Sequence, residues 1–308
     1  MPGHGILYDR FFYQLMKKTQ IVLDIAGLLL LAIFFVSGSQ SAAQSITGHL
    51  GSGLLNEVSG VVVSKKFKDR LYVHNDSGDD NRFFAINSKG ELISVINFNS
   101  DTRVTDCEDI DIGPGPIHGL SYLYIADIGD NAAMRSDIAI YRIEEPGQLE
   151  NNMTVPAEKI VVHYPDGPRD AESLFIDPLE KMLYIISKRE DSPHIYRLPL
   201  SIHGGDTVEA GLCGRLYVND SAKQNWFVAG NMSGQGDAIL LKTITRVYYW
   251  KRRKNEPAYR TLQRKPVRQT QYKPDGQQEA IAFTPDNNGF FILSEGKGKP
   301  IYRYKLLK

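Results

Sequence analysis

Four glutamates precede short apolar segments at spacings of 51, 64 and 107 residues: Glu57, Glu108, Glu172 and Glu279. After Glu57 and Glu108, a second apolar segment follows in the chain, and it is succeeded by Asp76 in the first case and Asp127 in the second. Each of these aspartates begins an Asp-x-Gly-Asp sequence. Carboxylates packed together raise one another's pKa or recruit a cation, and calcium prefers about six to eight oxygen ligands. We therefore expect these six acids to bind calcium, provided that the fold gathers them. The alternative, that they bind backbone amides at strand starts and turns, stays open.

Basic residues take over in the corresponding places later in the chain, at Lys188, Lys242 and Arg246. Fixed cations beside a metal suit an anionic substrate such as a phosphate or a carboxylate, so we expect these three residues to hold it. Solvated loop charges are the alternative. His74, two residues before Asp76, is a weak candidate for a general base, and its alternative role is packing.

The composition excludes several classes of protein. The chain has 36 basic and 36 acidic residues and 42% hydrophobic residues, which indicates a folded globular protein without a global basic field for nucleic acid. It also lacks a serine-hydrolase elbow, a P-loop and a zinc-protease helix. Charge is nevertheless segregated, with 11 acids and three bases in residues 75–131, and nine bases and one acid in residues 246–268. We expect residues 246–268 to form a solvated outer loop rather than a nucleic-acid site.

A repeated pattern of short strands must position these side chains. The acid-led segments are followed by second strands that start at Leu71, Leu123, Leu183 and Phe290, and by third strands at Phe84, Ile140, Ile195 and Ile301. Fourth strands are visible at residues 93–98 and 159–164, and a degenerate copy occupies residues 226–250. Four-stranded units of this length are typical of the blades of a β-propeller. We predict an all-β, single β-propeller with five countable blades, six being possible, closed by residues 45–50. An open β-sandwich is the alternative.

The N-terminal segment has the features of a secretory signal. Lys17 and Lys18 precede an apolar run at residues 21–36, and small residues follow up to Ala43. We predict a signal peptide at residues 1–43, a propeller domain at residues 44–308, and an extracytoplasmic, periplasmic or secreted, location. The alternative is a membrane anchor formed by residues 21–36, although this run is shorter than the roughly 20 residues of a spanning helix.

The repeated blades resemble propellers of the TolB, NHL and calcium-dependent phosphotriesterase type over most of residues 50–308. The acid-led strands and the loops at Asn75 and Asp127 also resemble the bacterial phytase-like propellers. This resemblance implies an exported propeller that binds calcium at a carboxylate-lined channel mouth and that could hydrolyse a phosphoester or a lactone. We expect the protein to be a monomer and its ligand to be a small anion. A non-catalytic propeller that binds a protein or a glycan is the alternative, and no nucleic-acid partner is expected.

Overall fold

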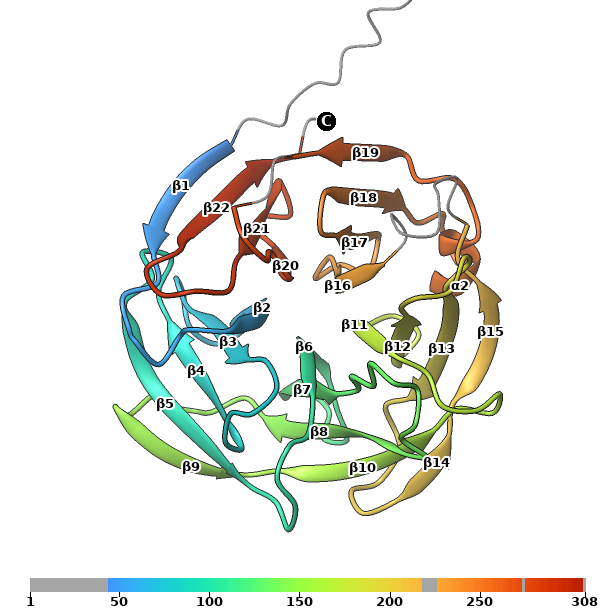
Figure 1. The fold of residues 1–308 in the computed structure, drawn as a ribbon, viewed down its shortest axis with the longest axis horizontal. Coiled ribbons are helices and arrows are strands. Elements are labelled where there is room, and N and C mark those ends of the chain that lie inside the picture. The colour runs from blue at the N-terminus through green and yellow to red at the C-terminus, as the bar shows by residue number, and fades with distance from the viewer. Residues whose placement is uncertain (1–43, 218–225, 273–274, 307–308) are drawn as a thin grey trace, which may run out of the picture. The chain divides into compact units, whose positions relative to one another are not determined.

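The computed structural model describes residues 44–217, 226–272 and 275–306. These residues form five β-sheets around a central channel (Figure 1), so the predicted all-β propeller is confirmed with five blades. In this part of the chain no helix is long and apolar enough to cross a membrane. The predicted signal peptide, or membrane anchor, at residues 1–43 lies outside the described residues.

In each blade four strands pair antiparallel, and the first of them lies nearest the centre of the ring, which we call the channel (Figure 1). The first blade contains β2 (Val58–Val63), β3 (Leu71–Asn75), β4 (Arg82–Ile86) and β5 (Leu92–Asn99), with β9 (Asn152–Pro156) parallel to β5. The second contains β6 (Cys107–Pro114), β7 (Ser121–Asp127), β8 (Ile138–Glu144) and β10 (Glu158–His163), with β14 (Thr207–Glu209) parallel to β10. The third contains β11 (Ala171–Asp177), β12 (Met182–Ser187), β13 (His194–Pro199) and β15 (Gly211–Arg215).

The last two blades complete the ring. The fourth contains β16 (Phe227–Met232), β17 (Ala238–Thr243), β18 (Arg246–Lys251) and β19 (Arg268–Gln271). The fifth contains β20 (Ala280–Phe283), β21 (Gly289–Leu293) and β22 (Pro300–Lys305), and β1 (Gln44–His49) pairs antiparallel with β22 as its outer strand. The predicted closure by an N-terminal strand is therefore confirmed, and it removes the open edge that β22 would otherwise present.

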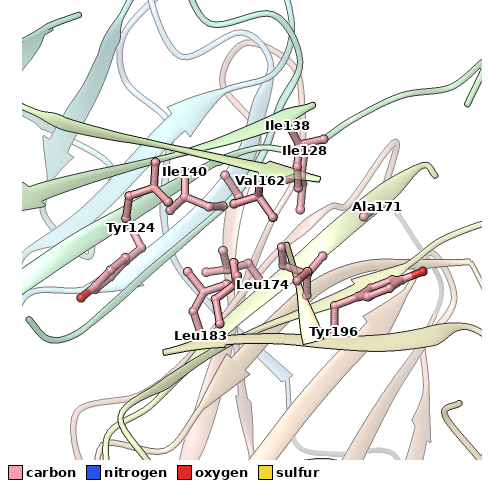
Figure 2. Packing of buried hydrophobic residues seen from close by; sticks show 14 of the residues in the cluster. Tyr124, Ile128, Ile138, Ile140, Val162, Ala171, Leu174, Leu183 and Tyr196 are labelled. Atoms are coloured by element: carbon pink, nitrogen blue, oxygen red, sulfur yellow. The ribbon is translucent and has the colours of Figure 1, made fainter. Parts of the chain in front are cut away.

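Apolar side chains on both faces of each blade hold the ring together. In β7, Tyr122, Tyr124 and Ala126 pack against the third blade, whereas Leu123 and Ile125 pack against the first. Figure 2 shows the cluster between the second and third blades. Because successive strand residues point to opposite faces, a strand buried on both faces needs an unbroken apolar run. The repeated Leu-Tyr-Ile pattern in the sequence has this cause.

The basic segment at residues 246–268 differs from the predicted solvated loop. It contains β18, the helix α2 (Ala258–Leu262) and the first residue of β19. Ala258 and Leu262 are fully buried against Trp250. Arg252 forms an ion pair with the buried Asp177, with 2.9 Å between Nη1 and Oδ2. The prediction was wrong because charge counts do not reveal apolar residues spaced along a short helix, or cations paired with acids of another blade.

Two aspartates of β6 cross-link the inner strands within the channel. Asp109 accepts hydrogen bonds from the backbone N–H of Leu174 on β11, at 2.9 Å, and of Gly230 on β16, at 3.0 Å. Asp111 accepts one from the backbone N–H of Ile176, at 2.7 Å. Asp109 therefore ties three blades together, and it lies inside the channel rather than among the acids at its mouth.

Candidate metal centre

The inner strands begin at one mouth of the channel. In the second and third blades a β-bulge at the start of the inner strand places a glutamate there. In the second blade Cys107 pairs with Asp127 and Asp109 with Ala126, so Glu108 is an extra, bulged residue. Glu172 has the same place in the third blade, and Glu279 directly precedes β20 at the equivalent register. Because β-bulges re-aim side chains at strand ends, the bulges bring Glu108 and Glu172 to equivalent positions. Glu279 reaches the same register from the residue before β20, where the described pairing has no bulge.

Glu57 does not share this register position. Ser59 lies between the paired residues Val58 and Gly60, so it holds in the first blade the place that Glu108 holds in the second. Glu57 is two residues earlier in the chain and exposed to solvent. The predicted ring of four equivalent glutamates thus contains three, with Glu57 on its rim.

A second set of side chains enters the mouth directly after the second strands. Backbone N–H groups at these positions donate to carbonyl oxygens before the inner strands: Asp76 to Glu57 at 2.8 Å, Lys188 to Asp170 at 2.8 Å, and Glu295 to Gln277 at 2.9 Å. Glu295 was not predicted from the sequence. Its position shortly after the second strand of its blade, two residues after β21 against one for Asp76 after β3, was the available signal.

Five carboxylates form two overlapping groups at the mouth. Asp76 lies with Glu279 and Glu295 in one group, and with Asp106 and Glu108 in the other. Within each group, one oxygen of every residue lies within 4.8 Å of the others. Asp76 belongs to both groups and joins the first blade to the second and fifth. We call these five residues the carboxylate sector.

Burial and mutual repulsion disfavour the charged forms of these acids. Burial, with Asp106 and Glu279 nearby, raises the pKa of Asp76 to about 6. Burial and the Glu279 carboxylate raise the pKa of Glu295 to about 8. The pKa of Glu108 is raised well above its ordinary value, chiefly by burial. A cation among these groups would offset both effects.

A glycine leaves room for the carboxylate oxygens. A Cβ atom on Gly129 would lie 2.2 Å from Oε1 of Glu108 and 2.4 Å from Oδ2 of Asp106. Any other residue would therefore displace these side chains. The Asp-x-Gly-Asp sequence thus contributes its glycine to the carboxylate sector.

Asp127, a predicted ligand, lies outside both groups. Its carboxylate accepts hydrogen bonds from the backbone N–H of Thr105 at 3.1 Å and of Asp106 at 3.0 Å, and pairs with Arg135 at 2.9 Å. It therefore positions the segment that carries Asp106 and has no oxygen in the carboxylate sector.

The third blade places neutralising cations among its acids. Lys188 donates a short hydrogen bond to Glu172, and Arg189 pairs with Asp170 at 2.5 Å. The guanidinium of Arg189 also lies 4.8 Å from the ring centre of Trp226. Burial raises the pKa of Glu172 to about 8, although the Lys188 ammonium opposes this shift. We call Asp170, Glu172, Lys188 and Arg189 the paired sector.

The other two predicted cationic residues belong to neither sector. Lys242 is fully buried in β17, where Nζ donates to the carbonyl oxygens of Thr243, at 3.2 Å, and Gln278. Burial lowers the pKa of Lys242 to about 7. Arg246 is the half-buried first residue of β18. Of the three predicted substrate-binding cations, only Lys188 belongs to these two sectors.

His74 is enclosed within the first blade. Only 1% of the residue is exposed, and Nδ1 lies 2.8 Å from the carbonyl oxygen of Asn75. Burial lowers the pKa of His74 to about 4. A Cβ atom on Gly60 would lie 2.1 Å from Nε2, so the ring packs against the backbone of β2. This environment suits a neutral packing residue.

No protein-family model matches the chain, and no curated protein is significantly similar to it in sequence. The structure therefore establishes a five-bladed propeller, while the resemblance to the calcium-dependent and phytase-like propellers remains a prediction.

Proposed function

We propose that the carboxylate sector binds a divalent cation, with calcium as the metal. The observation that carries this proposal is the place of Asp76 in both carboxylate groups, which puts five acids from three blades around one part of the mouth. All five offer oxygen, the ligand atom of hard cations. The space over Gly129 and the raised pKa of Asp76 fit a site in which a cation offsets charge repulsion.

The lysine beside the carboxylate sector supports an anionic ligand. Lys188 lies close enough to Asp106 and Glu108 to oppose part of the rise in their pKa values, which burial chiefly causes. It would face the anionic group of a ligand whose other oxygens reach the metal. A bound calcium ion would polarise a phosphoester or lactone and lower the pKa of a metal-bound water. An exported protein, as residues 1–43 predict, would also meet the calcium concentrations that weak extracellular sites use.

Within this proposal Glu108 and Glu295 are oxygen ligands of the cation. His74 takes no part, because it is enclosed within the first blade. The enclosure of His74 favours the second candidate function, a non-catalytic propeller that holds a protein or glycan ligand through the metal.

Calcium titration calorimetry on chelator-treated protein tests the metal site. We expect a saturable binding isotherm for the unaltered protein and at least about a tenfold loss of affinity in Asp76→Asn, a change of about 1.4 kcal/mol. Asp101→Asn removes an exposed carboxylate outside the carboxylate sector and serves as the matched control. Absence of binding, or equal affinity in both variants, would contradict the proposal.

Hydrolysis is tested separately with panels of phosphomonoesters, phosphotriesters and lactones in calcium. Turnover that disappears with chelator and in Glu108→Gln would establish the enzyme. Calcium binding without turnover on any panel would favour the non-catalytic alternative.

A further inference from the structure

A cavity of about 590 Å³ lies at the opposite mouth, where the inner strands end. Its walls include Ile112 of β6, Ile176 of β11 and Met232 of β16, which are buried apolar residues. The loop at residues 113–121 adds backbone and small side chains. The carboxylate sector lies at the starts of the same strands, so this cavity is a separate place on the propeller.

The cavity is lined by basic residues, whereas the carboxylate sector at the other mouth is acidic. Three lysines and one histidine line it, and no acidic residue does: Lys65, Lys66, Lys181 and His118. Lys66 is engaged with Glu144, at 3.9 Å, and with the carbonyl oxygen of Glu145. Lys65 and Lys181 form no ion pair within the described residues. Both ammonium groups are therefore open to a ligand, although Lys65 also lies near the buried Asp111 and opposes part of the rise in its pKa.

Lys65 reaches across the mouth. It belongs to the connection after β2, in the first blade, whereas Gly234 follows β16 in the fourth. A Cβ atom on Gly234 would nevertheless lie only 3.1 Å from Nζ of Lys65. The side chain of Lys65, an exposed residue, therefore extends along the cavity to the fourth blade, and its ammonium group lies beside Gly234.

A buried acid holds the backbone that carries this lysine. Glu145 is fully buried and accepts hydrogen bonds from the hydroxyl of Ser64 at 2.6 Å and from the backbone N–H groups of Lys65, at 3.0 Å, and Lys66, at 3.1 Å. With its charge satisfied by these donors, Glu145 fixes the loop in place. A ligand would therefore meet a preformed cationic site and lose less free energy in ordering it.

We propose that this cavity binds a small organic anion, with a phosphate or carboxylate group at Lys65 and Lys181 and an apolar body against Ile112, Ile176 and Met232. The combination of an apolar wall with a few convergent charges is the usual design of a small-molecule site. This proposal is independent of the carboxylate sector and requires no metal.

Calorimetry with 1-naphthyl phosphate, in chelator, tests the proposal, and 1-naphthol serves as the uncharged comparison. We expect saturable binding of the phosphate and at least about tenfold weaker binding of the alcohol, because the ion pairs would be lost. Lys65→Gln and Lys181→Gln should each weaken binding of the phosphate about tenfold, while Lys65→Arg retains most of it.

Lys254→Gln removes an exposed lysine outside the cavity, and Asp76→Asn alters only the other mouth, so both should leave naphthyl phosphate binding unchanged. Melting curves would confirm that each variant is folded. No binding of the phosphate, equal binding of 1-naphthol, or equal affinity in Lys65→Gln and Lys254→Gln would overturn the proposal.

Discussion

Glu108 and Glu172 hold the same register position in neighbouring blades, but of the two only Glu172 has a cation in direct contact with its carboxylate. Both are buried, with 4% and 5% of the residue exposed. Glu172 has the ammonium of Lys188 beside it, whereas Glu108 lies among Asp76 and Asp106. The paired sector contains its own cations, whereas the carboxylate sector concentrates negative charge. Neighbouring charge, and not position in the repeat, therefore distinguishes a structural acid from a candidate metal ligand.

The largest effect is expected from breaking the paired sector. Lys188→Met leaves Glu172 buried without a counter-ion, which should cost about 3 kcal/mol in the free energy of unfolding at pH 8.5. The loss should shrink at pH 6, because burial raises the pKa of Glu172 and removal of Lys188 raises it further, so the carboxyl group is then protonated. Urea denaturation measures both values.

The double variant Lys188→Met with Glu172→Gln is the control for this pair. It removes the orphaned charge and should recover most of the lost stability. A single Lys188→Met variant as stable as the unaltered protein at pH 8.5 would show that the paired sector is not held by this ion pair.

Glu108→Gln should stabilise the protein, in contrast to Lys188→Met. In chelator it removes one of several repelling buried carboxylates, and we expect a gain of about 1 kcal/mol in the free energy of unfolding. Glu209→Gln, on the outer strand β14, replaces an exposed glutamate and should change stability by less than about 0.5 kcal/mol. Urea denaturation in which Glu108→Gln destabilises the metal-free protein would contradict the proposed charge repulsion.

The smallest effect is on the pH dependence of the metal-free protein. Acids with raised pKa hold more protons in the folded state, so their contribution to stability falls as pH rises through the folded pKa. Asp76, Asp111, Glu172 and Glu295 have folded pKa values of about 6, 7, 8 and 8. His74, with a pKa lowered to about 4, acts in the opposite direction below its ordinary pKa, but it is a single group.

We therefore expect the melting temperature in chelator to fall by roughly 4 °C between pH 5 and pH 7. Glu295→Gln should make this fall smaller, and saturating calcium should remove the part that comes from Asp76 and Glu295, because Asp111 and Glu172 lie outside the carboxylate sector. Differential scanning calorimetry at the two pH values provides the measurement. A melting temperature that rises over this interval would contradict the assigned shifts.

Much of this arrangement was predictable because the blade repeat is strong. Both faces of each blade are buried, so apolar runs recur in the sequence. When these runs are aligned, Glu108, Glu172 and Glu279 take equivalent positions in their repeats. The first copy was misaligned, because Glu57 precedes the bulge position, held by Ser59, by two residues. Only strand pairing reveals such an offset.

Other features depend on contacts that periodicity cannot encode. Asp76 directly follows β3, whereas Asp127 is the last residue of β7 and pairs with Cys107 as Asn75 pairs with Val58. Asp127 is therefore one residue out of register with Asp76, and it forms an ion pair with Arg135 instead. Lys242 seemed to be a loop residue, although the fold buries it beside Gln278 of the next blade. Glu295 was overlooked because no acid-led motif marks the end of a second strand.

The melting temperature in saturating calcium and in chelator tests the central claim most directly. At about 100 times the dissociation constant, calcium should raise the melting temperature of the unaltered protein by roughly 5–10 °C. Asp76→Asn should lose most of this rise, while Asp101→Asn should keep it. No rise with calcium in the unaltered protein, or the same rise in Asp76→Asn, would contradict a metal centre in the carboxylate sector.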